Sequence, residues 1–152
     1  MITYQNIHKA FDLPVLSGVD FRVETGEMFA LFGPSGTGKS VLLKTTIGLM
    51  VPDRGDVVID GISVFGGGRG AVQAVREKVG YVFQNSALFD SLDVLDNVTM
   101  GLPEDELARL SRADAGRRVW DALEIVNLEP REVLAKIPSE LSGGMKKRVG
   151  IA

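Results

Sequence analysis

Hydrophobic and polar residues alternate one by one in three short segments of the N-terminal part of the chain. These segments are residues 2–4, 19–23 and 57–62. Alternation of this kind is typical of strands with one buried and one solvated face, so it predicts an antiparallel sheet. Two uninterrupted apolar runs, residues 28–32 and 79–83, are instead typical of parallel strands buried on both faces. The N-terminal part is therefore predicted to be of the α/β class.

A helical pattern follows the first apolar run and returns from residue 93 onwards. Residues 41–50 form the first predicted helix. In the second region an apolar stripe at helical spacing comprises Val119, Leu123 and Val126, with Trp120 and Leu128 at its margins. Such a stripe belongs more often to a core than to an interface. Two glycine-containing segments separate these elements, a turn at 52–55 and a connector at 66–70.

The residues between the first apolar run and the first predicted helix fit the phosphate-binding pattern G-x-x-x-x-G-K-[ST]. They are Gly33, Pro34, Ser35, Gly36, Thr37, Gly38, Lys39 and Ser40. The glycines let backbone N–H groups wrap around a polyphosphate, and the following helix N-terminus adds a partial positive charge. Lys39 is expected to reach the β and γ phosphates, and Ser40 is expected to offer its hydroxyl to Mg²⁺. The sequence thus predicts a site for a nucleoside triphosphate.

Composition narrows the class of protein further. The 152 residues are 45% hydrophobic and 24% charged, as in one ordinary soluble domain, and no apolar run reaches the roughly 18 residues that a membrane span needs. The net charge of -3 gives no general electrostatic reason to bind nucleic acid. Because the chain has no cysteine and only one histidine, His8, thiolate metal sites, disulfides and a zinc cluster are not expected.

A second motif, Leu141–Met145, precedes the basic residues 146–148. Taken alone it is an ordinary helix start capped by Ser142. Taken with the phosphate loop, it makes the chain resemble an ATP-binding cassette (ABC) ATPase, the motor subunit of ABC transporters. The resemblance covers all 152 residues and rests on four features in the order that the family has them. These are the aromatic residue Phe11, the phosphate loop 33–40, Gln84 within residues 82–85, and the signature sequence 141–145.

The resemblance implies a role for each feature. Phe11 would stack on the adenine of ATP, since stacking on an aromatic face suits a loosely held base. Lys39 and Gln84 would act in catalysis, with Gln84 helping Ser40 to hold Mg²⁺ and also holding the attacking water. The signature residues Ser142, Gly143 and Gly144 would bind the ATP of a second subunit, so the working form is expected to be a homodimer. The loop after Gln84 would lead to a separate integral membrane permease.

Several details resemble one branch of the family. Met145 stands where the family usually has glutamine, and the segments 83–92 and 36–44 look like those of Mla-type and MCE-linked lipid transport ATPases. This implies ATP-driven transport of lipid or phospholipid by a cytoplasmic subunit, peripheral on the inner face of the cell membrane, with no nucleic acid partner. Two alternatives remain open at this point. They are a soluble ABC ATPase without a permease, and a nucleotide-binding regulatory fragment that does not hydrolyse ATP.

The resemblance also implies an architecture. It is a P-loop NTPase core with an N-terminal antiparallel β subdomain and a helical subdomain, with residues 1–90 as the nucleotide-binding α/β part and 91–152 as the helical part. After residue 152 the family pattern continues into the Walker B strand and the glutamate that activates water. We therefore expect the chain to be the N-terminal portion of a longer subunit, truncated before the Walker B strand and inactive in hydrolysis by itself. Strands 28–32 and 79–83 would be separated in the sheet by strands from the missing part.

Overall fold

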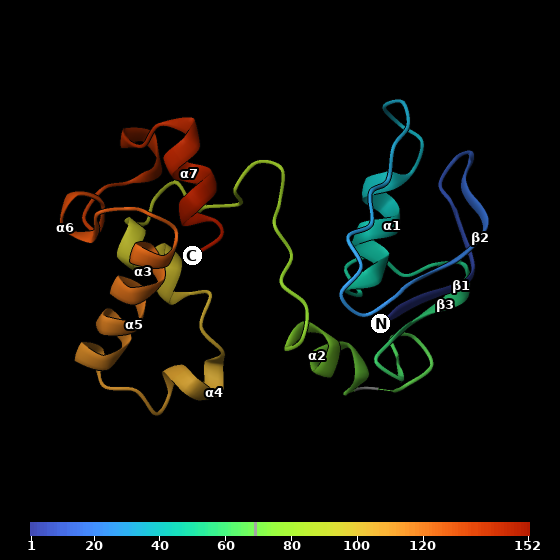
Figure 1. Ribbon diagram of the computed structural model, residues 1–152, viewed down its shortest axis with the longest axis horizontal. Coiled ribbons are helices and arrows are strands. Elements are labelled where there is room, and N and C mark those ends of the chain that lie inside the picture. The colour runs from blue at the N-terminus through green and yellow to red at the C-terminus, as the bar shows by residue number, and fades with distance from the viewer. Residues whose placement is uncertain (69) are drawn as a thin grey trace. The chain divides into compact units, whose positions relative to one another are not determined.

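A four-stranded antiparallel sheet organises the N-terminal part of the protein (Figure 1). The computed structural model describes residues 1–68 and 70–152, with the side chains of residues 104 and 105 outside the description. The strands are β1 (Ile2–Ala10), β2 (Pro14–Val23), β3 (Arg54–Ile59) and β4 (Ile62–Ser63), in the order β2-β1-β3-β4. In the register, Tyr4 lies opposite Phe21 on one side and Val57 on the other. The antiparallel sheet predicted from residue alternation is thus confirmed.

The third alternating segment, 57–62, is not one strand. It is the hairpin of β3 and β4, with Ile59 opposite Ile62 and a two-residue turn between them. Asp60 and Gly61 have φ values of 46° and 82°, the left-handed region that a tight hairpin of this kind requires. An Asp-Gly pair supplies such a turn without strain, so the chain reverses where the apolar pattern alone predicts continuation.

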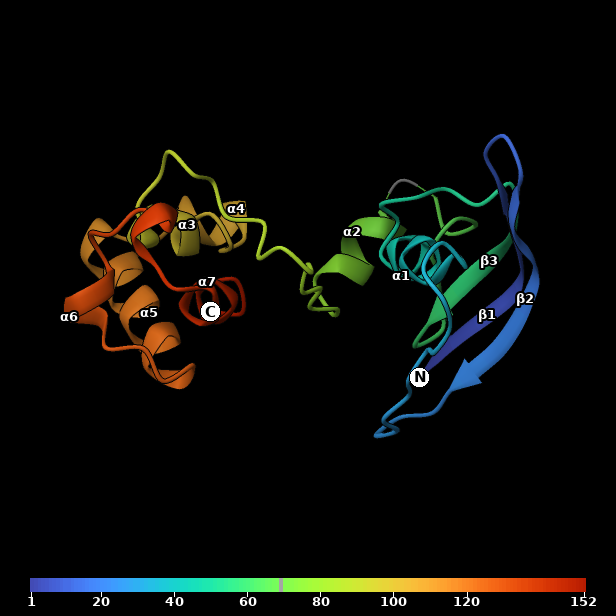
Figure 2. The same ribbon diagram turned by 90° about the horizontal axis from the view of Figure 1, so that it is seen from above.

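Helix α1 (Lys39–Thr46) packs on one face of this sheet (Figures 1 and 2). Its buried residue Leu42 joins the core of the unit with Tyr4, Ile7, Leu16, Val57, Ile59, Val64 and Val75. The Tyr4 hydroxyl lies 2.6 Å from Thr46 Oγ1. Burial raises the pKa of the Tyr4 hydroxyl, and the hydrogen bond with Thr46 only partly offsets this effect. One polar contact therefore ties the helix to the middle of the sheet.

The predicted helix 41–50 starts earlier and ends earlier than its apolar pattern indicates. It ends at Thr46 because Gly48 adopts a left-handed conformation with φ 66°, and the N–H of Leu49 then donates to Lys44 O at 2.9 Å. A glycine in this conformation just after the last turn is a common helix stop.

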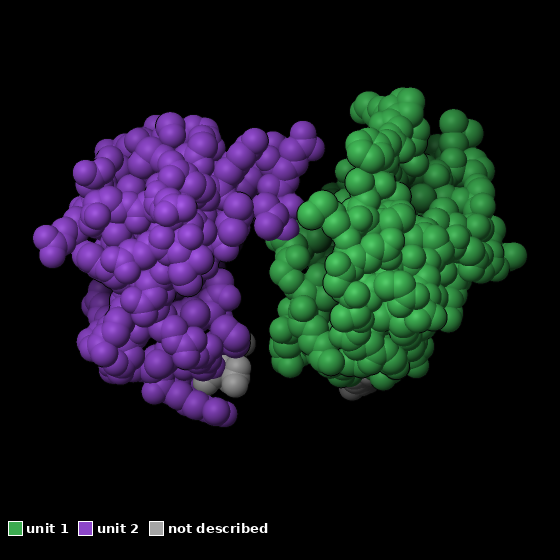
Figure 3. All heavy atoms as spheres, viewed as in Figure 1, with its two compact units in different colours: residues 1–81 green, residues 82–152 purple. Residues whose placement is uncertain are grey.

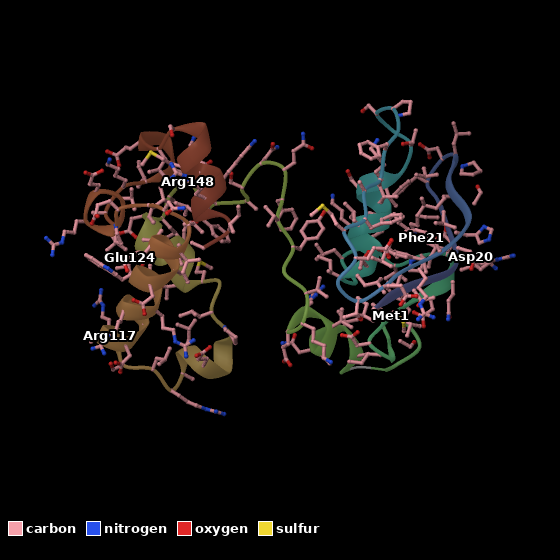
Figure 4. The ribbon with its side chains drawn as sticks, viewed as in Figure 1. Met1, Asp20, Phe21, Arg117, Glu124 and Arg148 are labelled. Atoms are coloured by element: carbon pink, nitrogen blue, oxygen red, sulfur yellow. The ribbon has the colours of Figure 1, made fainter. Side chains whose placement is uncertain are left out.

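The two predicted parallel strands, 28–32 and 79–83, are not strands in the structure. Met28 and Phe32 are 98% and 91% exposed, so that run is not buried on both faces. Instead, Phe29 stacks on Phe21 with ring centroids 4.9 Å apart, and Phe21 (Figure 4) stacks on Tyr4 at 4.3 Å. A strand needs hydrogen-bonded neighbours, and none of the four strands in the described ranges pairs with either run. An apolar run indicates that a segment is suited to a buried environment. It does not indicate whether an adjacent strand is present to pair with that segment.

The chain divides into two compact units, residues 1–81 and 82–152 (Figure 3). Helix α2 (Ala71–Arg76) belongs to the first unit, and the predicted connector 66–70 includes Arg69, which lies outside the described residues. The second unit is helical, as predicted from residue 93 onwards. Its elements are α3 (Val94–Thr99), α4 (Glu104–Leu107), α5 (Arg112–Ile125), α6 (Pro130–Val133), the 3-10 turn η1 (Pro138–Glu140) and α7 (Gly143–Val149).

The core of the second unit forms around α5. Val119, Leu123 and Leu128 are all at most 5% exposed and pack with residues of the neighbouring helices, among them Val94 and Val133. Val126 packs against the same cluster at its edge. The predicted stripe of Val119, Leu123 and Val126 is therefore confirmed as core, whereas Trp120 at its margin is half-buried and lies outside this cluster.

Candidate functional site

The predicted phosphate loop, residues 33–40, connects residue 32 to the first turn of α1. Gly36 and Gly38 have φ values of 84° and 87°, which L-residues with a side chain rarely adopt. At Gly38 an added Cβ would lie 2.8 Å from Leu16 Cδ2 and 2.9 Å from Val15 Cγ1, so the loop also packs against β2 there. At Gly36 nothing lies within 4 Å of an added Cβ, and the loop is open on that side. The glycines thus fix the conformation of the loop and its contact with the sheet.

The side chain of Lys39 curls back into this loop. Its Nζ donates to Gly33 O at 2.7 Å, to Pro34 O at 2.6 Å and to Thr37 Oγ1 at 3.3 Å. Thr37 Oγ1 in turn donates to Pro34 O at 3.0 Å. The ammonium group therefore lies inside the curve of the loop, at the position where a polyphosphate is predicted. Ser35 and Ser40 are exposed, with the Ser40 hydroxyl on the first turn of α1.

A hollow of about 420 Å³ lies between the loop, the start of α1 and the face of β2. Leu16, Val19 and Phe21 form its sheet side, and Leu31 and Leu42 complete the apolar wall. Most of the remaining lining belongs to the phosphate loop and includes Thr37 and Lys39, so the loop side supplies the positive charge that phosphate groups need. The hollow therefore joins the candidate phosphate site on the loop side and is apolar on the sheet side.

Phe11 lies in the connection between β1 and β2 and is 58% exposed. Its N–H donates to Leu13 O at 3.1 Å, and the Nζ of Lys9 lies 5.7 Å from the centroid of its ring. The connection points to the same end of the first unit as the loop before α1 (Figure 1). The first unit therefore carries both the predicted base-stacking residue and the predicted phosphate loop.

Gln84 and the signature residues lie in the second unit. Gln84 is exposed in a turn over residues 84–87, where Ser86 and Ala87 have φ values of 58° and 52°. The end of α7 packs against this turn, since an added Cβ on Gly150 would lie 2.8 Å from Ser86 O. The turn and the signature helix are thus parts of one packed unit.

Ser142 caps α7, because its Oγ accepts from the N–H of Met145 at 3.3 Å. This confirms the predicted helix start. Gly143 and Gly144 are exposed in the first turn, where backbone N–H groups of a helix have no partner within the helix. The first turn of α7 therefore offers exposed donors of the kind that bind an anion.

Asn97 has a clear structural role that no sequence motif indicates. Its Oδ1 accepts from the N–H of Phe89 at 2.7 Å. Its two Nδ2 hydrogens are shared among three carbonyl oxygens within hydrogen-bond distance, those of Phe89 at 3.1 Å, Leu92 at 3.0 Å and Asp93 at 2.9 Å. The side chain therefore ties the segment after the Gln84 turn to α3. The only signal in the sequence is Asp93, which caps α3 and so indicates that Asn97 faces the preceding segment.

Mg²⁺ fits the donor groups at the phosphate loop. In the part of the chain that the structure describes, no group of three or more histidine and acidic residues is arranged to hold a metal ion. Mg²⁺ is commonly bound by one or two protein oxygens together with phosphate oxygens and water. The exposed Ser40 hydroxyl can supply such a protein oxygen. Over the same described residues, none of the helices combines the length and apolar character that crossing a bilayer demands.

Comparisons with known proteins give a consistent picture. A methionine import ATP-binding protein, MetN 1 of Pseudomonas fluorescens, is 41% identical and covers 100% of the chain. A sulfate/thiosulfate import ATP-binding protein, CysA of Rhodopseudomonas palustris, is 42% identical over 99% of the chain. The chloroplastic protein TRIGALACTOSYLDIACYLGLYCEROL 3 of Arabidopsis thaliana is 40% identical over 100% of it. The chain spans 46%, 42% and 43% of the lengths of these relatives, respectively.

The solved structures agree with the sequences. A dimeric post-hydrolysis state of the ATP-binding cassette MJ0796, bound to ADP and Pi, matches with a TM-score of 0.85 and 31% identity, covering 99% of this chain and 67% of that one. The sequence profile of the family described as "ABC transporter" matches residues 16–152. That range contains the phosphate loop, Gln84 and the signature sequence in the expected order. The chain therefore belongs to the ABC transporter family, with the P-loop fold of its ATP-binding domain.

Proposed function

We propose that this chain binds Mg-ATP as the ATP-binding part of an ABC transporter ATPase. The observation that carries the proposal is the phosphate loop, in which Lys39 Nζ lies 2.6 to 2.7 Å from two loop carbonyl oxygens. On ATP binding, triphosphate oxygens would replace these carbonyl oxygens as partners of the Lys39 ammonium group, because its hydrogen bond with a charged phosphate is stronger than one with a neutral oxygen. The N-terminus of α1 and the Ser40 hydroxyl complete the proposed phosphate and Mg²⁺ site.

Phe11 is proposed to hold the adenine ring by stacking. More than half of its side chain is exposed, so one ring face remains available to a base. Stacking on an aromatic face contributes roughly 1 to 3 kcal/mol and discriminates little between bases. In this proposal Phe11 anchors the nucleotide, while residues 33–40 recognise its phosphates.

Hydrolysis is proposed to depend on Lys39 and Gln84. Lys39 would neutralise charge on the transferred phosphoryl group, and Gln84 would orient the attacking water and help to hold Mg²⁺. Positioning and charge stabilisation supply most of the catalysis in phosphoryl transfer. Gln84 suits this role because it is an exposed polar residue, and its turn packs at Ser86 against Gly150, the residue that follows α7.

The active form is proposed to be a dimer in which Ser142, Gly143 and Gly144 of one subunit meet the ATP of the other. The exposed first turn of α7 supports this, because its N–H groups have no partners within the helix. The matching MJ0796 cassette is described as dimeric and bound to ADP and Pi, which also supports a shared site.

A membrane permease is the proposed partner, with a lipid or phospholipid as cargo. The proposed contact surface is residues 84–92, which include Phe89, an aromatic residue that is 54% exposed. Two of the relatives are named as importers of methionine and of sulfate or thiosulfate, whereas the name of the third contains a galactolipid. The lipid proposal rests on that relative together with Met145 and the segments 36–44 and 83–92. Through the permease the protein would be peripheral to the membrane.

Titration calorimetry with Mg-ATP tests the central proposal. Lys39→Ala should abolish measurable binding, because the variant loses the positive charge at the centre of the loop. Lys44→Ala is the matched control, since it removes a lysine from the last turn of the same helix and should leave the affinity unchanged. Equal affinities of the Lys39→Ala variant and the unaltered protein would overturn the proposal.

Purification from membranes tests the proposed partner. The protein should bring with it a polytopic membrane protein and phospholipid, and Phe89→Ser should reduce this recovery without changing ATP affinity. Recovery of a permease with bound methionine and no phospholipid would refute the lipid cargo. Recovery of ribosomes or DNA would point instead to an ABC ATPase that works without a permease.

A further inference from the structure

The connection that carries Phe11 is fastened to the turn before β3. Asp53 makes three hydrogen bonds there, all to the last residues of β1. Its Oδ1 accepts from Lys9 Nζ at 2.9 Å, and its Oδ2 accepts from the N–H of Ala10 at 2.7 Å. Its own N–H donates to His8 O at 2.8 Å. The end of β1 is thus fixed at the three residues that precede Phe11.

Lys9 extends this contact to the ring itself. Its side chain is 18% exposed, compared with 47% for Asp53, so the lysine lies mostly against protein. Its Nζ is shared between the Asp53 carboxylate and the Phe11 ring, whose centroid lies 5.7 Å away. That distance is within the range of a cation–π interaction. The Asp53 carboxylate therefore holds the cation that lies over Phe11.

The charge state of Asp53 agrees with this geometry. The hydrogen bond from Lys9, followed by that from the Ala10 amide, holds the pKa of the Asp53 carboxyl below its ordinary value. The carboxyl is therefore ionised at neutral pH and available to the ammonium group. An exposed aromatic residue in a surface loop would otherwise sample several orientations, and ordering it would reduce the affinity for a stacked base.

We propose that Asp53 and Lys9 are positioning residues that hold the Phe11 ring in the orientation that receives the nucleotide base. Lys9 covers one side of the ring and leaves the other to the base. The inference rests on the proposed function of Phe11, and it adds two residues outside the phosphate loop and the signature sequence. It predicts that removing either charge weakens the binding of a nucleotide but not of a ligand that has phosphates and no base.

Calorimetric titrations with Mg-ATP and with magnesium tripolyphosphate test this inference on the unaltered protein and its variants. Asp53→Asn and Lys9→Met should each weaken Mg-ATP binding about two- to fivefold, as expected for an exposed cation–π interaction. Both should leave tripolyphosphate binding unchanged. Phe11→Ala should weaken Mg-ATP binding roughly 5- to 150-fold, and adding Asp53→Asn to it should cause no further loss.

Asp60→Asn is the matched control. Asp60 is an exposed aspartate of the same unit that pairs with the amino terminus at 2.6 Å, away from Phe11. Its replacement should change neither affinity. If Asp53→Asn weakens ATP and tripolyphosphate binding equally, or still weakens ATP binding in the Phe11→Ala background, the positioning role is refuted while the proposed function stands. If Lys39→Ala binds both ligands like the unaltered protein, the proposed function fails, and the inference fails with it.

Discussion

Replacement of Asn97 by alanine should loosen the segment that follows Gln84. The Asn97 amide accepts one hydrogen bond and faces three carbonyl oxygens with two N–H hydrogens, so it supplies three hydrogen bonds in total. Each net hydrogen bond stabilises a fold by roughly 0.5 to 1.5 kcal/mol. Three such bonds together give roughly 1.5 to 4.5 kcal/mol. The contacts with Phe89 are exposed, and those with Leu92 and Asp93 are partly buried, so the sum should lie in the lower half of this total range. We expect Asn97→Ala to lower the free energy of unfolding by about 2 kcal/mol.

Urea unfolding followed by tryptophan fluorescence measures this change. Trp120 is the single tryptophan of the chain and lies on α5, which contacts α3. Hydrogen exchange adds a local measurement, because the N–H of Phe89 donates directly to Asn97 and should exchange faster in the variant. Asn97→Asp tests the donating Nδ2 apart from the accepting Oδ1. The variant keeps an acceptor for the N–H of Phe89 but places a carboxylate oxygen against the carbonyl oxygens. It should therefore destabilise the protein at least as much as alanine does.

Asn85→Ala serves as the control for Asn97. Asn85 is an exposed asparagine in the turn at 84–87, and its replacement should change the free energy of unfolding by less than about 0.5 kcal/mol. Asn97 does not hold this segment if Asn97→Ala unfolds at the same urea concentration as the unaltered protein and the N–H of Phe89 exchanges at the same rate. In that case the segment after Gln84 would be held by its apolar contacts, such as those of Leu88 with the core of the second unit.

Three further predictions concern other parts of the structure. Gly38→Ala should weaken Mg-ATP binding at least tenfold in calorimetry, because the left-handed conformation and the contacts with Val15 and Leu16 exclude a Cβ, whereas Gly116→Ala in α5 should have no such effect. Leu123→Ala should lower the free energy of unfolding, measured by urea unfolding, by about 2 to 5 kcal/mol. Ile125→Ala, at a residue that is 80% exposed, should lower it by less than about 0.5 kcal/mol. Because the folded pKa of Asp53 lies below its ordinary value of 3.8, its stabilising contribution is present above pH 3.8 and is lost as pH falls through the lower, folded pKa. Thermal melts at decreasing pH should therefore show the unaltered protein converging with Asp53→Asn.

The antiparallel sheet and the second core could be predicted because burial there follows from local spacing. Tyr4 lies on an apolar face that the two-residue period of a strand reveals, and Leu123 lies on one that the 3.6-residue period of a helix reveals. Both side chains are buried. Residues 28–32 have an equally clear apolar pattern, yet Phe32 is 91% exposed. A parallel strand depends on neighbours distant in sequence, and local pattern contains no information about whether these are present.

In the candidate site, too, features encoded in one local segment could be predicted, and features that depend on distant segments could not. The glycine-rich loop at the start of α1 could be predicted because its motif lies in one contiguous segment, residues 33–40, and its binding of phosphate stays a prediction. The contributions of Asp53 and Asn97 could not, because each acts through hydrogen bonds to a segment elsewhere in the chain. Neither residue type is unusual at its position, since aspartate is common in turns and asparagine is common on helix surfaces. Only the folded backbone brings their partners within reach.

The close contact of Gly38 with Val15 and Leu16 means that β2 determines the distance between Phe11 and the phosphate loop. The strand starts at Pro14, soon after Phe11, and passes the phosphate loop at Val15 and Leu16. It therefore sets the span between the proposed resting places of the base and of the triphosphate. Surface hairpins usually accept extra residues at little cost. Here a single residue inserted between Phe11 and Pro14 would lengthen that span, so nucleotide binding would weaken by up to the roughly 5- to 150-fold expected for Phe11→Ala while the fold remained intact.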